Sequence, residues 1–118
     1  MILQENYTLS NGLEIPKLGL GTWMIDNDAV VSAVKSALDL GYRHIDTAQA
    51  YGNEQGVGVG LRDSGVDRSD IFVTTKVDAG AKSHEDAAAS IDGSLTALGL
   101  DYIDLMIIHS PQPWDAFN

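Results

Sequence analysis

Four side chains of this 118-residue chain have the types that a proton-donating site needs. They are a carboxylate, a phenol, an amine and an imidazole: Asp46, Tyr51, Lys76 and His109. A phenol has a pKa of about 10, and a nearby ammonium group lowers it by stabilising the phenolate. A carboxylate helps a buried ammonium group to stay charged, and a neutral imidazole can donate a hydrogen bond that orients a carbonyl group. This set suits the reduction of a carbonyl group if a hydride donor lies nearby.

Alternating strand and helix signals predict the frame that brings these groups together. Parallel strands joined by right-handed helical crossovers have their C-terminal ends on one rim, about 4.8 Å apart between neighbours. Because Asp46, Lys76 and His109 follow three consecutive apolar runs, we expect them to converge at that rim, with Tyr51 on the loop above Asp46. The predicted strands are 18–23, 44–46, 71–76 and 102–108, and the predicted helices lie between 28 and 41, over 53–62, and between 83 and 99.

Local signals indicate where several elements begin or turn. Asn11-Gly12 predicts a hairpin over 7–15 in which both turn residues have positive φ. A residue of 26–28 is expected to cap the first helix, and Ser83, three positions before Asp86, is expected to cap the third. The predicted buried stripes of the first and third helices are Val30, Ala33, Val34, Ala37 and Leu38, and Ala88, Ile91, Leu95 and Leu98.

The second predicted helix contains three closely spaced glycines, Gly56, Gly58 and Gly60. Each weakens a helix by about 1 kcal/mol relative to alanine. Their spacing is not G-x-G-x-x-G and no strand leads into them, so they do not form a dinucleotide-binding fingerprint. The strand predicted over 102–108 is almost continuously apolar, which is typical of a strand buried on both faces.

Each of the four candidate residues also has an ordinary structural explanation. Asp46 suits a capping or loop-bonding aspartate, and Tyr51 suits a surface tyrosine. Lys76 equally suits a strand-end lysine, and His109 suits a core histidine whose ring is hydrogen-bonded. Taken singly, these roles are hard to distinguish from catalytic ones; taken together, the four residues are much less easily explained as structural.

Three further aromatic side chains have no comparable neighbours in the sequence. His44 and His84 are predicted to be structural and solvent-facing. Trp114 suits a packing anchor, and the alternative is that it walls a substrate pocket.

The composition limits the classes of partner. With 44% hydrophobic and 20% charged residues, the sequence predicts one folded domain over 1–118. The net charge of −10 argues against nucleic acid and anionic membranes as partners. The lack of cysteine excludes disulfides and thiolate metal sites, and we expect no metal centre. Residues 1–5 do not resemble a signal peptide, and no apolar run approaches the ~20 residues of a membrane span, so we expect a cytoplasmic protein.

The motifs around the candidate residues resemble those of the aldo-keto reductases, in particular the bacterial group that includes 2,5-diketo-gluconate reductases. The likeness runs from about residue 7 to residue 114 in the expected order. The motifs are LGLGTW at 18–23, GYRHIDTA at 41–48, YGNE at 51–54, TTK at 74–76 and IIHSP at 107–111. The resemblance implies an α/β fold, the N-terminal half of a (β/α)8 barrel with four parallel strands and three helices, preceded by a hairpin across its bottom.

The same resemblance implies reduction of small aldehydes or ketones with NADPH, and NADH remains open as the alternative. Tyr51 would be the general acid and Lys76 the ammonium group that makes it a stronger acid. Asp46 would be the counter-charge, and His109 would orient the carbonyl group.

The resemblance also implies cofactor and substrate contacts. Gly21, Thr22 and Asp46 would lie near the nicotinamide, and Trp23, His109 and Trp114 would contact the substrate. Many relatives have a tryptophan directly after the histidine, where this chain has Ser110. That departure leaves open both the substrate role of Trp114 and the choice of substrate.

The length implies an incomplete barrel, because such a barrel takes about 250 residues. We expect the rest of the barrel, or a second copy in a homodimer, to cover the unprotected edge of the fourth strand, and we expect the chain alone to be inactive. The alternative function is a non-catalytic half-barrel scaffold that self-associates. A third is a different barrel enzyme, because fold alone does not determine function.

Overall fold

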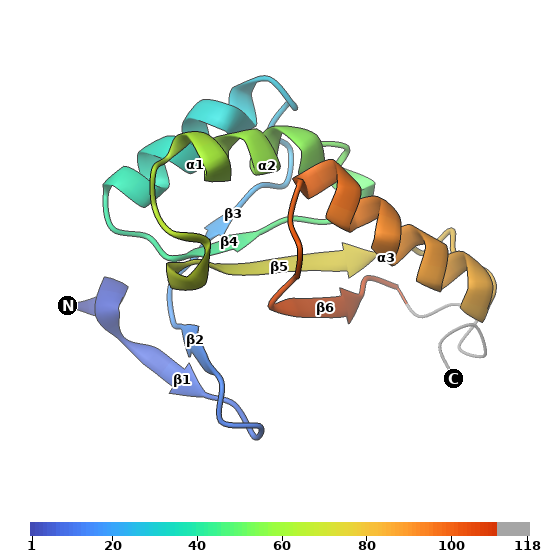
Figure 1. The fold of residues 1–118 in the computed structure, drawn as a ribbon, viewed down its shortest axis with the longest axis horizontal. Helices are drawn as coiled ribbons and strands as arrows, with labels where there is room; N and C mark the ends of the chain where they lie inside the picture. The colour runs from blue at the N-terminus through green and yellow to red at the C-terminus, as the bar shows by residue number, and fades with distance from the viewer. Residues whose placement is uncertain (111–118) are drawn as a thin grey trace.

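The computed structural model describes residues 1–110, which form a hairpin followed by alternating strands and helices (Figure 1). The hairpin pairs β1 (Asn6–Thr8) with β2 (Glu14–Pro16). The parallel sheet has the order β3 (Leu20–Gly21), β4 (His44–Asp46), β5 (Phe72–Val77) and β6 (Leu105–Ile108). The helices are α1 (Ala29–Asp39), α2 (Glu54–Asp63) and α3 (His84–Leu98), and three short 3-10 helices are η1 (Ile2–Gln4), η2 (Gln49–Tyr51) and η3 (Arg68–Asp70).

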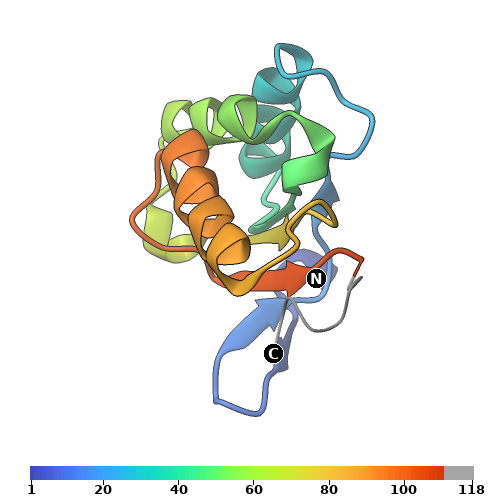
Figure 2. The ribbon, with the colours of Figure 1, turned by 90° about the vertical axis from the view of Figure 1, so that its right-hand side faces the viewer.

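The strand order confirms the predicted half barrel. The three helices lie on one side of the sheet, and no helix of residues 1–110 covers the other side (Figures 1 and 2), as expected for part of a barrel wall. The hairpin lies at the end of the sheet where the strands begin. There, hairpin residues line one hollow together with Arg43, Phe72 and Asp104. The core between helices and sheet contains Val30, Val34, Leu38, Ile45, Val57, Leu61, Ile71, Val73 and Leu98.

The three glycines of α2 allow close packing on two opposite sides of that helix. A Cβ on Gly56 would run into the Asn27 carbonyl oxygen in the segment before α1, and one on Gly58 would run into the Leu98 carbonyl group at the end of α3. A Cβ on Gly60 would also press against α1. The helix-weakening glycines are therefore required because α2 is wedged between α1 and α3.

Two predicted local features are wrong in detail. Of the hairpin turn, Gly12 alone has positive φ, 87°, and the Asn11 side chain instead accepts a hydrogen bond from the Leu13 amide, at 3.0 Å. Asp28 stands at the N-cap of α1 without a side-chain capping bond. The nearby amide oxygen of Asn27 accepts from the Gly56 amide of α2, at 2.8 Å, because tertiary packing brings that donor within reach.

The predicted fourth strand is present, but it is shorter than 102–108, and its predicted burial on both faces is wrong. The strand begins only at Leu105, and no residue of β6 is buried. β6 is the edge of the sheet within residues 1–110, so its apolar side chains lack cover: Ile107 is 40% exposed and Ile108 is 37% exposed.

The buried stripe of α3 differs from the predicted one. Ser94 and Leu98 are buried, while Ala88 is exposed. Ile91 and Leu95 are half-buried. A serine can be buried on this face because the Gln49 side-chain amide donates a hydrogen bond to the Ser94 hydroxyl, at 3.0 Å.

Candidate functional site

The C-terminal rim of the sheet brings the predicted polar residues together. Asp46 is the last residue of β4, Lys76 is the second-last of β5, and His109 directly follows β6. Tyr51 ends η2, the short helix that follows β4, and Gly52 then reverses the chain with φ of 69°.

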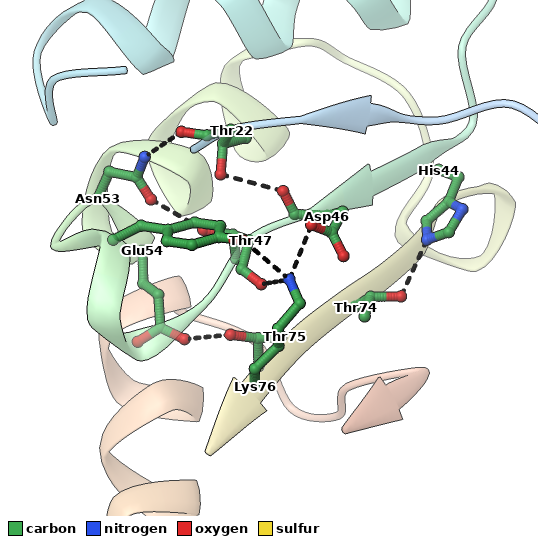
Figure 3. Close-up of polar contacts among 10 residues, drawn as sticks. Thr22, His44, Asp46, Thr47, Asn53, Glu54, Thr74, Thr75 and Lys76 are labelled. Carbon is green, nitrogen blue, oxygen red and sulfur yellow. Dashed lines mark hydrogen bonds and ion pairs between the residues drawn. The ribbon is translucent and has the colours of Figure 1, made fainter. Parts of the chain in front are cut away.

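Lys76 is the centre of this cluster (Figure 3). Its ammonium nitrogen Nζ lies 2.8 Å from Asp46 Oδ2, 2.8 Å from the Thr47 carbonyl oxygen and 3.3 Å from the Tyr51 hydroxyl. The lysine side chain is only 11% exposed, whereas that of Asp46 is 34% exposed. The ammonium group is therefore buried with a paired carboxylate, and it directs one hydrogen bond to the phenol.

The rings of Tyr51 and His109 complete the cluster. They meet edge to face, with centroids 5.8 Å apart and planes at 84°. Lys76 Nζ lies 4.9 Å from the centroid of the tyrosine ring. The phenol thus has an ammonium group and an imidazole as neighbours, and the His109 side chain is exposed at the rim.

The predicted cofactor and substrate residues of the first loop lie beside this cluster. Gly21 pairs with Asp46 across β3 and β4, and a Cβ placed on it would meet open space. Thr22 is buried and donates both its amide and its hydroxyl to the Asp46 carbonyl oxygen, each at 3.0 Å. Trp23 is 70% exposed next to them, and Trp114 lies outside the described residues.

Several supporting residues were not singled out from the sequence as site residues. Asn53 is fully buried and its side chain bonds to Thr22, Ile25 and Thr47. On the helix side of the sheet, Glu54 Oε2 accepts from the Thr75 hydroxyl at 2.7 Å. Asn53 and Glu54 stand in the YGNE motif, which was the one signal that could have identified them.

His44 forms a second polar layer beneath the cluster, two residues before Asp46 on β4. Its Nε2 lies 2.9 Å from the Thr74 hydroxyl, and its ring meets Phe72 edge to face. Burial lowers the pKa of His44 below 6.5, against a hydrogen bond to the Pro16 backbone and nearby carboxylates that act to raise it. The neutral ring is therefore favoured. His84, in contrast, is exposed.

Two kinds of feature are absent from the described part of the chain. Residues 1–110 contain no group of three or more histidine, aspartate or glutamate side chains placed to hold a metal ion. In the same range, no helix has the length and apolar character to cross a bilayer.

Comparison with known proteins gives one consistent family. Residues 17–117 match the Aldo/keto reductase family. A 9,11-endoperoxide prostaglandin H2 reductase of Trypanosoma cruzi (strain CL Brener) is 49% identical over 105 residues, which cover 88% of this chain and 37% of that protein.

Solved structures agree with this sequence match. A crystal structure of an aldo/keto reductase from Brucella melitensis superimposes with a TM-score of 0.91 at 49% identity, and the match covers 96% of this chain and 43% of that one. The Bombyx mori aldo-keto reductase in complex with NADP gives a TM-score of 0.88 at 38% identity, covering 94% and 39%.

The chain therefore spans about two fifths of the length of these relatives, 37% to 43%. Within that span, the family match covers the four strands, the three helices and the rim that carries Asp46, Tyr51, Lys76 and His109. Sequence, fold and the order of the motifs lead to the same conclusion: the chain belongs to the aldo/keto reductase family.

Proposed function

We propose that this chain carries the proton-donating part of an enzyme that reduces aldehydes or ketones to alcohols with NADPH. The observation that carries the proposal is the contact of one buried ammonium group, Lys76, with both a phenol and a carboxylate. A surface tyrosine and an unrelated strand-end lysine would have no reason to share a hydrogen bond at 3.3 Å, with a histidine ring against the tyrosine.

In this proposal, Tyr51 donates its proton to the carbonyl oxygen of the substrate while a hydride is added to the carbonyl carbon. The nicotinamide cofactor supplies that hydride when it is bound. Lys76 stabilises the phenolate that remains, and its own position is fixed by Asp46 and the Thr47 carbonyl group. The exposed imidazole of His109, next to the phenol, orients the carbonyl oxygen.

The rim also has features that fit the nicotinamide end of the cofactor. Open space in front of Gly21 permits a flat ring to approach the backbone, and the carboxylate of Asp46 remains one-third exposed beside it. Thr22, bonded to the Asp46 carbonyl group, would form the floor. Trp23 would contact the substrate, and Trp114 is a second candidate for this contact.

We propose that the residues that bind the adenosine phosphate of the cofactor lie outside this chain. Its three arginines are occupied by backbone carbonyl groups: Arg43 by Leu38, Arg62 by Leu98, and Arg68 by Ile71. The preference for NADPH over NADH therefore rests on the Bombyx mori relative that was solved with NADP. The absence of cysteine fits a reducing compartment, and we propose the cytoplasm.

We further propose that more polypeptide must pair with β6 before the site is active. The basis is the span of only about two fifths of each relative, together with the exposed Ile107 and Ile108 at the sheet edge. Self-association as a non-catalytic scaffold is the second candidate, favoured by the same exposed edge. Native mass spectrometry separates them: an active species longer than 118 residues supports the first, and an inactive dimer of this chain supports the second.

The proton-donor role is tested by Tyr51→Phe in the active enzyme. We expect kcat to fall by about 10²–10⁴-fold, because general acid catalysis contributes that much, while the Kd for NADPH stays unchanged. Tyr42→Phe is the matched control, since Tyr42 is also half-buried but lies outside the cluster. An unchanged kcat in Tyr51→Phe would refute the role.

A further inference from the structure

The loop between β3 and α1 contains a turn in a strained conformation. The Ile25 amide donates to the Thr22 carbonyl oxygen at 3.2 Å, which closes a four-residue turn. Met24, its third residue, has φ of 65°, and it is the one residue other than glycine with positive φ in the described range 1–110. Such a turn ordinarily has glycine or asparagine at this position, so the methionine is held in an unfavourable conformation.

This turn presents two large apolar side chains at the rim. Trp23 is 70% exposed and Met24 is 82% exposed. Their backbone is next to the proposed site, because Thr22 donates twice to the carbonyl group of Asp46. Trp23 and Met24 are therefore exposed apolar side chains in the loop that adjoins the proposed site.

One buried amide, that of Asn53, holds both ends of the turn. Its Nδ2 donates to the Thr22 carbonyl oxygen at 2.8 Å and to the Ile25 carbonyl oxygen at 3.0 Å (Figure 3 shows the contact with Thr22). Both amide hydrogens are thus used on the first and last residues of the turn. A strained turn persists only when its surroundings over-determine it, and this amide provides that constraint.

The same amide connects the turn to the proton-donating residues. Its Oδ1 accepts from the Thr47 hydroxyl at 2.8 Å, and the carbonyl group of Thr47 binds Lys76 Nζ at 2.8 Å. Asn53 also stands two residues after Tyr51. It therefore links the apolar turn to the segment that carries the phenol and to the lysine that the phenol contacts.

We propose that Asn53 is a positioning residue: its amide holds the strained turn of residues 22–25 against the rim, so that Trp23 and Met24 favour carbonyl substrates with a large apolar substituent. The selectivity part of this inference rests on the proposed reductase function. The clamping part rests on the geometry alone, so the two are tested separately.

Amide hydrogen exchange tests the clamp without any assay of activity. We expect Asn53→Ala to speed exchange of the Ile25 amide at least about tenfold, because the turn opens locally when its constraint is lost. Gln49→Ala is the matched control: that amide also makes three hydrogen bonds, but to Ser90, Ser94 and Asp78, away from the turn. Equal effects of both variants on the Ile25 amide would overturn the clamp.

Met24→Gly provides the second variant, because glycine relieves the strain that the clamp opposes. With Gly at position 24, Asn53→Ala is expected to change Ile25 exchange much less than it does with methionine there. If Asn53→Ala alone does not fold, the proposed clamp predicts that the double variant Asn53→Ala/Met24→Gly folds or has a higher Tm than Asn53→Ala. Additive effects of the two substitutions on exchange, or the same loss of folding in Asn53→Ala and in the double variant, would contradict the clamp.

Selectivity is measured in the active enzyme as the ratio of kcat/KM for an aromatic aldehyde to that for acetaldehyde. Asn53→Ala is expected to lower this ratio about tenfold, since misplacing an apolar wall affects the larger substrate alone. Gln49→Ala should leave the ratio within about twofold, because general destabilisation affects both substrates equally. An unchanged ratio in active Asn53→Ala overturns the selectivity part. A parent enzyme without reductase activity refutes the proposed function and this part together, while the exchange result still decides the clamp.

Discussion

The two charges of the Lys76–Asp46 pair are buried to different depths, so removing one should cost more folding free energy than removing the other. The lysine side chain is 11% exposed and that of Asp46 is 34% exposed, with 2.8 Å between Nζ and Oδ2. Asp46→Ala leaves the more deeply buried charge without its counter-ion, and breaking a buried pair in this way costs about 3–5 kcal/mol. We expect about 3 kcal/mol, at the low end, because the Thr47 carbonyl group still accepts from the ammonium group.

Lys76→Met leaves the shallower charge, which water can partly solvate, and the methionine fills most of the vacated volume. We expect a loss of about 1–2 kcal/mol in the free energy of unfolding, close to that of a lost hydrogen bond to a charged group. In the double variant neither charge of this pair remains, so its loss of stability should be smaller than the sum of the two single losses by about 2 kcal/mol.

The assay is equilibrium urea unfolding at pH 7, followed by far-UV circular dichroism, with both the midpoint and the slope fitted. Lys17→Met is the control, because Lys17 pairs with Glu5 on the surface and its loss should cost less than about 1 kcal/mol. The reasoning is refuted if Lys76→Met destabilises the protein more than Asp46→Ala does, or if the two losses simply add. Either result would mean that burial does not determine the energetics of this pair.

Two further predictions concern packing and pH. Gly58→Ala forces a methyl group into the Leu98 carbonyl group, so we expect the free energy of unfolding to fall by about 2 kcal/mol or more. Gly93→Ala, at an open site in α3, should raise it by about 0.5–1 kcal/mol. Thermal unfolding of both variants measures the difference. Because burial lowers the pKa of His44, the unfolded state binds more protons between that lowered pKa and 6.5. The free energy of unfolding should therefore be highest above pH 6.5 and decrease as the pH falls through this window, and urea unfolding at several pH values should show this decrease in His84→Gln but not in His44→Gln. A decrease that persists in His44→Gln would contradict the assignment.

Much of the architecture followed from local sequence patterns. The positions of α1, α2 and α3 and the order of the strands were predicted because helical and strand spacings are properties of neighbouring residues. The Ser83 cap was likewise predicted, and its hydroxyl accepts from the Asp86 amide at 3.0 Å. Polar residues at successive strand ends also indicated a shared rim, since the ends of parallel strands always meet there.

Some features could not be predicted because they depend on contacts between distant parts of the chain. The exposure of β6 depends on what lies beside it in space: its apolar pattern is typical of a strand buried on both faces, and only the length of the chain indicated an uncovered edge. The same limit applied to the glycines of α2. Their apparent cost to the helix is explained only by the backbone of α3, which approaches Gly58 too closely for a side chain.

The sequence by itself therefore determined which elements form, in what order, and which polar residues stand at their ends. The tertiary structure alone decided how those residues are held: Lys76 Nζ reaches Asp46 across 30 positions of sequence, and Asn53 reaches Thr22 across 31. The physical reason is that propensity and periodicity act over a few residues, whereas a hydrogen bond between strands or loops exists only once the sheet has brought its partners within about 3 Å.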